Sequence, residues 1–260
     1  MVKLRVLGTG TSVGVPQIGC SCATCTSSDP RDKRKRCAVY LSSPAGALLV
    51  DTPPELRIAC LEYGVSKVDA LLLTHAHMDH VAGFDDVRRF NTINGGRVLE
   101  CRALPETIAM MHHIFPYIGT QGGANGLYRP QVAFAPVAPF EPFEAAGFSV
   151  RAVPVEHGFP CCGYIFSQGG ARIGYVPDCH VLPPETLDAL RGVDVMVLNC
   201  LREREHSTHL TLERSLAYLG EIAPGRAYIT HMCHDLSYAQ YLEKLPAGVL
   251  PAFDGLEISA

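Results

Sequence analysis

The 260-residue chain suits one large α/β domain or two small ones, and its 47% apolar content excludes a disordered protein. The net charge of -4 argues against a broad basic surface for nucleic acid. The N-terminus alternates charged and apolar residues, which predicts a strand and not a signal peptide, and no apolar run approaches the about 20 residues that a membrane-spanning helix needs. Because 11 cysteines occur without a signal peptide, we expect a reducing, cytoplasmic location.

Hydrophobic periodicity predicts alternating strands and helices. The expected strands lie at 2–7, 37–42, 47–51, 68–74, 97–101, 147–153, 161–166, 171–176, 194–199, 226–230 and 255–258. The expected helices lie at 54–63, 80–90, 105–113, 184–190, 211–222 and 237–244. Several strands, notably 68–73 and 193–198, are apolar on both faces, so we expect sheet in the middle and helices outside. Both halves run from strands into strand–helix alternation, which hints at a duplicated architecture.

No linker divides the chain, so we expect a single domain over residues 1–260. Residues 119–130 are rich in glycine and lack a hydrophobic period, which predicts a long loop, either a tolerated insertion or a functional one. Residues 31–36 form a basic run, which is typical of a solvated face and could also hold a phosphate or a polyanion.

Four potential metal ligands follow the apolar strand at 68–74. His75 and His77 lie two apart on an extended segment, so both side chains can point the same way. Asp79 and His80 then begin the next helix, so their side chains point in a different direction. One turn can therefore contact two metal ions. Imidazole and carboxylate ligands suit Zn, Fe or Mn, and the end of a buried strand is where α/β folds usually place their chemistry.

Residues 75–83 (His-Ala-His-Met-Asp-His-Val-Ala-Gly) resemble the signature of the metallo-β-lactamase superfamily. The resemblance implies an α/β fold, a four-layer αββα sandwich that usually binds two metals. Four further residues match positions of the superfamily pattern, in the same order along the chain, and each ends or follows an apolar strand. They are Asp51, His157, Asp178 and His231.

The superfamily resemblance implies two ligand sets that share one carboxylate. The first metal would take His75, His77, His157 and Asp178. The second metal would take Asp79, His80, Asp178 and His231. A carboxylate is a natural bridge because each of its oxygens can hold one ion. We expect Asp51 to orient a ligand instead of binding metal directly.

Three cysteines, Cys20, Cys22 and Cys25, lie within six residues, and thiolates at this density in a reducing compartment indicate zinc. A structural zinc needs four ligands, so one more must come from elsewhere. The candidates are Cys37, His234 and any other free cysteine. A redox pair is a weaker alternative, and small buried residues in a turn are another.

Residues 8–16 (Gly-Thr-Gly-Thr-Ser-Val-Gly-Val-Pro), followed by the three-cysteine clip at 20–25, resemble one branch of the superfamily. That branch includes the phosphoribosyl 1,2-cyclic phosphate phosphodiesterase of the carbon–phosphorus lyase pathway. The resemblance implies that His234 is the fourth ligand of a structural zinc, with Cys233 as a rival. His231 and His234 would then serve two different metal sites, three residues apart.

His209 precedes the helix expected at 211–222 and matches the position of a histidine that protonates the leaving group in the resembled branch; His206 is a rival. A histidine can deliver a proton near neutral pH. We therefore expect a phosphodiesterase in which a hydroxide bridging two Mn or Zn ions attacks phosphorus, with His209 as general acid and Asp79 also in the catalytic site. His112 and His113 have no partner motif and are interpreted as structural or surface residues.

Three other functions compete with this one. A lactone or thioester hydrolase could use the same scaffold, although the cysteine clip counts against it. A nuclease of the tRNase Z type would need an RNA-gripping arm, for which residues 110–130 are a short candidate. A zinc-stabilised binding module would not need a complete ligand set. As partners we expect a small phosphodiester, no membrane and no nucleic acid beyond a small cyclic nucleotide, and a homodimer is left open.

Overall fold

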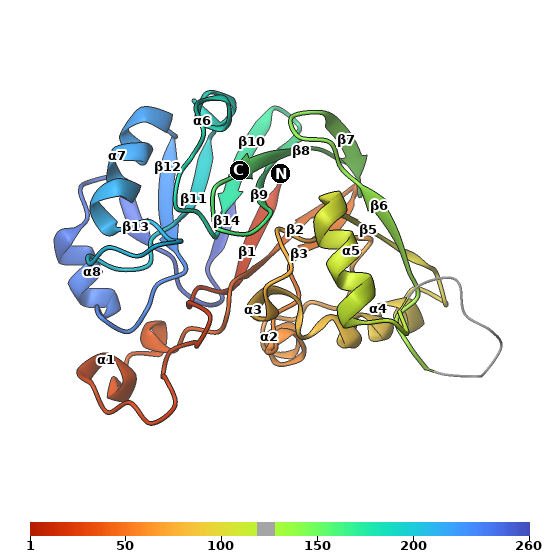
Figure 1. Cartoon of the computed structure of the whole chain (residues 1–260), viewed down its shortest axis with the longest axis horizontal. Helices are drawn as coiled ribbons and strands as arrows, with labels where there is room; N and C mark the ends of the chain where they lie inside the picture. Colours follow the sequence, from red (N-terminus) through yellow and green to blue (C-terminus); the bar gives the residue numbers. More distant parts are fainter. Residues whose placement is uncertain (119–127) are drawn as a thin grey trace.

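The computed structural model describes residues 1–118 and 128–260, and there the strands form two seven-stranded sheets (Figure 1). The first sheet has, in spatial order, β14 (Glu257–Ser259), β1 (Lys3–Gly8), β2 (Ala38–Ser43), β3 (Gly46–Val50), β4 (Ala70–Leu72), β5 (Leu99–Ala103) and β6 (Val132–Pro136). The second has β13 (Val249–Pro251), β12 (Arg226–Thr230), β11 (Val195–Asn199), β10 (Ala171–Val176), β9 (Cys161–Gln168), β8 (Phe148–Val155) and β7 (Pro142–Ala145). Each half of the chain therefore builds one sheet, and only β14 returns to the first.

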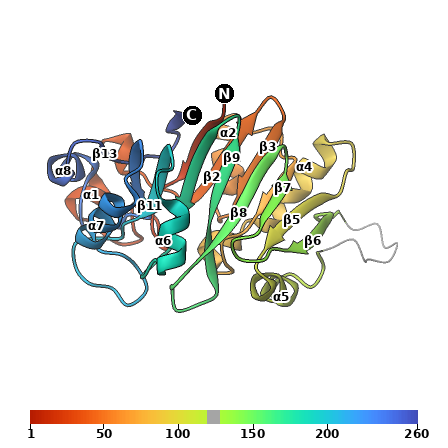
Figure 2. The same ribbon diagram turned by 90° about the horizontal axis from the view of Figure 1, so that it is seen from above.

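Helices cover the outer faces of both sheets (Figure 2). Beside the first sheet lie α2 (Leu56–Glu62), α3 (Met78–Val81), η2 (Phe84–Val87), α4 (Arg88–Ile93) and α5 (Pro105–Ile114). Beside the second lie α6 (Pro184–Leu190), α7 (Leu212–Ile222) and α8 (Tyr238–Lys244). The short α1 (Ala23–Thr26) and η1 (Pro30–Asp32) belong to the N-terminal loop. The αββα sandwich expected from the sequence is confirmed.

The central strands are apolar on both faces because each one contributes to two cores. Leu48 packs between the two sheets, whereas its neighbour Leu49 packs under the helices of the first sheet. In the second sheet Val195 packs between the sheets and Met196 packs under the helices. Successive strand residues point to opposite faces, so a continuous apolar run fills both layers. Full burial of each such side chain contributes about 1.5–3 kcal/mol.

The prediction of one helix over 80–90 is wrong, because the structure has the short helices α3, η2 and α4 there. Gly83 lies at the break, its N–H donates to Thr52 O at 2.8 Å, and a Cβ there would lie 2.1 Å from Pro53 O. The helix has to break here because residues 52–53, which follow β3, lie close to the backbone of Gly83.

The strands expected from the sequence did not include β6, β7 and β13. These are short strands at sheet edges, and their sequences lack a clear hydrophobic period.

The basic run at 31–36 is not a freely solvated face, because most of its side chains are partly or fully buried. Its side chains make ion pairs, namely Arg31–Asp29, Arg34–Asp32, Lys35–Glu62 and Arg36–Glu55. The Lys33 ammonium donates to Cys25 O at 3.3 Å. The run therefore ties the N-terminal loop to the body of the protein.

Most of the glycine-rich loop expected at 119–130 lies outside the described residues, because these resume at Tyr128. Among the described helices, each is too short or too polar to cross a membrane.

Replacing Gly83 by alanine should lower the free energy of unfolding by about 1–3 kcal/mol, because the new Cβ meets the Pro53 carbonyl. Gly220→Ala is the matched control, because that glycine lies inside α7 with open space around it, and alanine there should be neutral or stabilise by up to about 1 kcal/mol. Urea denaturation measures both. Equal stability of the two variants would contradict the close approach of Gly83 to residues 52–53.

Candidate metal centre

The side chains of the site come from strand ends that share one edge of the sandwich. Strands β3 and β4 are parallel neighbours, and so are β10, β11 and β12, so their carboxyl ends meet. Strand β8 runs in the same direction because two antiparallel pairings separate it from β10. The residues at or just after these ends are Asp51, His75, His157, Asp178, Asn199 and His231.

One donor group consists of three imidazoles. His75 Nε2 lies 2.9 Å from His77 Nδ1, and His157 Nε2 lies 3.2 Å from the same His77 atom. Two nitrogens on one tetrahedral ion would be about 3.3 Å apart, given metal–nitrogen bonds of about 2.0–2.1 Å. These three nitrogens can therefore face a single metal ion.

A second donor group lies around Asp79. The Nε2 atoms of His80 and His231 lie 3.5 Å and 3.7 Å from Asp79 Oδ2. Asp178 stands between both groups: its Oδ2 is 3.0 Å from His80 Nε2, and its Oδ1 is 3.1 Å from His231 Nε2 and 3.6 Å from His157 Nε2. Its position therefore allows the Asp178 carboxylate to contact both groups.

The buried polar atoms at the centre fit a divalent metal. His80 Nε2, His231 Nε2 and Asp178 Oδ2 are shielded from water, lie close together, and make no hydrogen bond. A buried polar atom without a partner costs about 1–3 kcal/mol, and a cation would satisfy all three. The mixed imidazole and carboxylate set suits zinc, iron or manganese.

Charge in the centre also favours a cation. Burial alone would raise the pKa of Asp178, but His231 and His80 hold it well below its ordinary value. Burial and the neighbouring His80 lower the pKa of His75. The reverse holds for His80, because the effect of burial is outweighed by Asp178 and Asp51, which raise its pKa well above the ordinary value.

Asp51 orients a ligand and lies one step away from the donor atoms. Its carboxylate lies 2.8 Å from His80 Nδ1 and accepts hydrogen bonds from the Thr74 N–H and hydroxyl at 2.8 and 2.9 Å. This leaves His80 Nε2 directed toward Asp178. Fixing the far nitrogen of a ligand imidazole is a common device for setting its tautomer.

His209 lies beside the centre, and Asn199 fixes its orientation. The Leu210 N–H donates to Asn199 Oδ1 at 2.9 Å, so the Asn199 amide nitrogen donates to Pro177 O at 2.6 Å and to His209 Nδ1 at 3.3 Å. The neutral His209 ring therefore carries its proton on Nε2. Burial and His231 lower the pKa of His209 to about 2. Sequence reasoning missed Asn199, although it too ends a buried strand.

Thr208, whose role at the site was not expected from the sequence, contacts two histidines. Its carbonyl oxygen lies 2.8 Å from His157 Nδ1 and so directs Nε2 of that ring into the first donor group. Its N–H and hydroxyl lie 3.3 and 3.2 Å from His206 Nδ1, which leaves Nε2 of His206 as the free nitrogen. The loop before α7 thus positions His157, His206 and His209 together.

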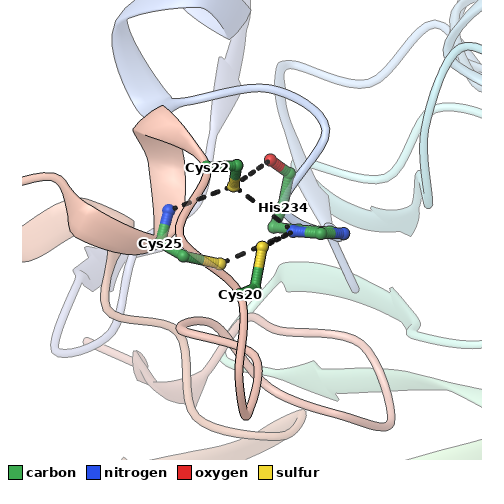
Figure 3. Close-up of side chains that lie close together, drawn as sticks. All are labelled: Cys20, Cys22, Cys25 and His234. Atoms are coloured by element: carbon green, nitrogen blue, oxygen red, sulfur yellow. Dashed lines mark hydrogen bonds between the residues drawn. The ribbon is translucent and has the colours of Figure 1, made fainter.

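The three cysteines of the N-terminal loop surround His234 (Figure 3). The Sγ atoms of Cys20, Cys22 and Cys25 lie 3.3, 3.4 and 3.5 Å from His234 Nδ1. Sulfur and nitrogen on one tetrahedral zinc would be about 3.6 Å apart, so this set fits zinc. The backbone N–H of Cys25 is the main cause that lowers the pKa of Cys22 to about 6, which favours the thiolate that a metal needs.

The rival ligands named from the sequence lie elsewhere. Cys37 is buried beside Gly10 O and the Thr230 hydroxyl, and burial raises its pKa well above the ordinary thiol value. Cys233 Sγ accepts from the Asp235 N–H at 3.4 Å. His112 packs edge-on against the Phe134 ring at 5.0 Å, away from both clusters.

A buried ion pair holds the turn that carries His231 and His234. Arg34 donates from Nη1 to Cys233 O at 2.6 Å and from Nη2 to Leu236 O at 2.9 Å. Its partner Asp32, at 3.0 Å, also accepts from the Tyr238 N–H at 2.7 Å. The basic run therefore contributes to the site by fixing this turn, a role that the sequence pattern alone did not suggest.

The family model for the beta-lactamase superfamily domain matches residues 47–232. The chain belongs to this superfamily. Membership of this superfamily supports the metal-dependent hydrolase expected from the sequence. The chain superimposes on the crystal structure of a diphosphatase from the PhnP family with a TM-score of 0.90 and 37% identity, over 100% of this chain and 98% of that one.

Two further proteins are similar to this chain. It is 34% identical over 267 residues to a Porphyromonas gingivalis octanoyltransferase, a match that covers 98% of this chain and 51% of that protein. The chain thus spans about half the length of that curated relative. It shares the fold of Zn(2+)-bound PqqB from Methylobacterium extorquens, with a TM-score of 0.81 and 20% identity over 99% of this chain and all of that one.

Replacing Arg34 by alanine should lower the free energy of unfolding by about 3–5 kcal/mol, because the Asp32 carboxylate would stay buried without a countercharge. Arg31→Ala is the matched control in the same run: its pair with Asp29 is exposed, so the loss should stay below about 1 kcal/mol. Urea denaturation of the metal-loaded protein gives both values. Similar losses would contradict the anchoring role of Arg34.

Replacing Cys22 by alanine should remove the metal of the clip and also lower occupancy of the centre, because His231 and His234 share one turn. Metal content measured by mass spectrometry tests this, with Cys60→Ala on α2 as a buried-thiol control. A Cys22→Ala protein that lacks the clip metal but keeps both metals of the centre and full activity would refute the coupling.

Proposed function

We propose that the protein is a two-metal phosphodiesterase that hydrolyses a small cyclic or ribose-linked phosphodiester. Manganese or zinc would occupy the centre, and zinc would occupy the cysteine clip. Residues His75, His77 and His157 would hold one ion, Asp79, His80 and His231 the other, with Asp178 between them.

The observation that carries this proposal is the position of Asp178. Its two oxygens reach different donor groups: Oδ1 lies 3.6 Å from His157 Nε2 of the first group, and Oδ2 lies 3.0 Å from His80 Nε2 of the second. A mononuclear site would need only one of these donor groups. When bound, a pair of divalent ions lowers the pKa of water and stabilises the charge that develops on phosphoryl oxygens.

In the proposed reaction, residues of the chain orient the metal ligands and donate the proton to the leaving group. Asp51 and Thr208 orient His80 and His157, so their free nitrogens point inward. His209 would donate from Nε2 to the leaving oxygen. Burial and His231 lower its pKa, and an anionic phosphodiester beside the ring is expected to raise that pKa.

The relatives support a phosphoryl substrate over an acyl one. The diphosphatase of the PhnP family matches nearly end to end, so its substrate chemistry is relevant to the whole chain. The octanoyltransferase match spans 51% of that protein, so its acyl-transfer activity cannot be assigned to the matched half.

A substrate panel tests the proposed function. The protein loaded with manganese or zinc should hydrolyse bis(p-nitrophenyl) phosphate and at least one cyclic phosphate, such as a 2′,3′-cyclic nucleotide. The same preparation should leave a lactone, an octanoyl thioester and a precursor tRNA unchanged. Rapid turnover of one of these three with inert phosphodiesters would overturn the proposal.

Replacing His209 by alanine should slow hydrolysis of an alkyl phosphodiester by roughly 10²–10⁴-fold, because a poor leaving group needs a proton. The loss should be much smaller on a nitrophenyl ester, whose leaving group departs as a stable anion. His206→Ala is the neighbouring control and should not reproduce this dependence on the leaving group. An equal loss on both esters in the His209 variant would discard the proton-donor role.

A further inference from the structure

Five aromatic rings form a row along the site. The ring centroids of Phe159 and His77 are 5.2 Å apart, and those of His77 and His157 are 5.1 Å apart. The row continues from His157 to His209 at 4.8 Å and from His209 to His206 at 5.0 Å. The inner rings of His157 and His209 are buried, whereas the end rings of Phe159 and His206 are half-buried.

Within the row, Phe159 contacts His77, whereas His209 contacts His157 and His206, so Phe159 and His209 lie at different points of the site. His77 and His157, two of the metal-binding candidates, occupy its middle. His209 carries the ring nitrogen that is proposed to protonate the departing oxygen. Phe159 offers only an apolar ring. A phosphodiester also has two different arms, one that leaves and one that stays on phosphorus.

The backbone fixes Phe159 at its end of the row. Gly158 has a φ of +75°, and a Cβ there would lie 3.2 Å from Thr208 Cγ2, so the turn is packed against the loop that carries His209. Pro160 follows directly, before β9 begins at Cys161. The Phe159 ring is tilted by 32° against that of His77. A side chain that is held in place in this way can stack on a ligand ring with little loss of its own freedom.

We propose that Phe159 binds a flat aromatic ring on the retained arm of the substrate. The substrate class is then a phosphodiester whose leaving oxygen lies toward His209 and whose other arm carries a nucleobase or an aryl group. This inference rests on the proposed phosphodiesterase function. It distinguishes such substrates from small sugar phosphates, which have no ring that could stack.

Two esters with the same leaving group test the proposal, namely phenyl p-nitrophenyl phosphate and methyl p-nitrophenyl phosphate. The metal-loaded protein should favour the phenyl ester in kcat/KM by roughly 2- to 10-fold, the range expected for one aromatic pair. In Phe159→Ala and in Phe159→Leu, that ratio should fall to about 1, mainly through KM. Tyr117→Ala removes an exposed aromatic ring outside the row and should keep the ratio.

The alternative is that Phe159 only supports His77. In that case both esters would lose the same factor in Phe159→Ala and the metal content would fall, and this result would overturn the proposal. Equal kcat/KM for the two esters in the unmodified protein would overturn it as well.

A binding measurement separates this inference from the proposed function. Calorimetry compares monophenyl phosphate with monomethyl phosphate, and the phenyl compound should bind roughly 2- to 10-fold more tightly, only while Phe159 is present. If both esters resist hydrolysis but this affinity ratio holds, the phosphodiesterase function fails and the ring site stands. If both esters are hydrolysed without any preference and the affinities are equal, the ring site fails and the function stands.

Discussion

His80 lies between two buried carboxylates that belong to different sheets, and this contact organises the site. Its Nδ1 is 2.8 Å from Asp51, which follows β3, and its Nε2 is 3.0 Å from Asp178, which follows β10. Burying two carboxylates with one imidazole leaves negative charge that needs compensation. A divalent cation would supply the missing positive charge. The two carboxylates that meet at His80 therefore favour a cation as the ligand of the site.

One turn carries residues of two candidate metal sites. His231 and His234 are three residues apart, one in the centre and one in the cysteine clip. Arg34 binds the carbonyl groups of Cys233 and Leu236 within the same stretch and is itself fully buried. The N-terminal loop therefore stabilises the last ligand of the centre, although its own residues lie some 200 positions earlier in the chain.

In the proposed reaction, different rings of the row would serve catalysis and recognition. Asn199 and Thr208 set the tautomers of His209 and His157 through hydrogen bonds to one nitrogen of each ring. Phe159 offers no hydrogen bond and contributes only a ring surface. His209 would thus donate the proton, while Phe159 would contact the part of the substrate that does not react.

The sequence by itself predicted central strands covered by helices, the strand ends and the kinds of metal donor, because apolar runs and the spacing of His75 and His77 are local properties. The four-layer sandwich followed from the resemblance of residues 75–83 to the superfamily signature. The sequence did not determine the break at Gly83, which depends on Pro53 crossing nearby. The choice of His234 over Cys233, and the roles of Asn199 and Arg34, were likewise decided by tertiary structure. Hydrogen-bond partners distant in the chain leave no periodic signal, so only the packed fold shows which polar side chains meet.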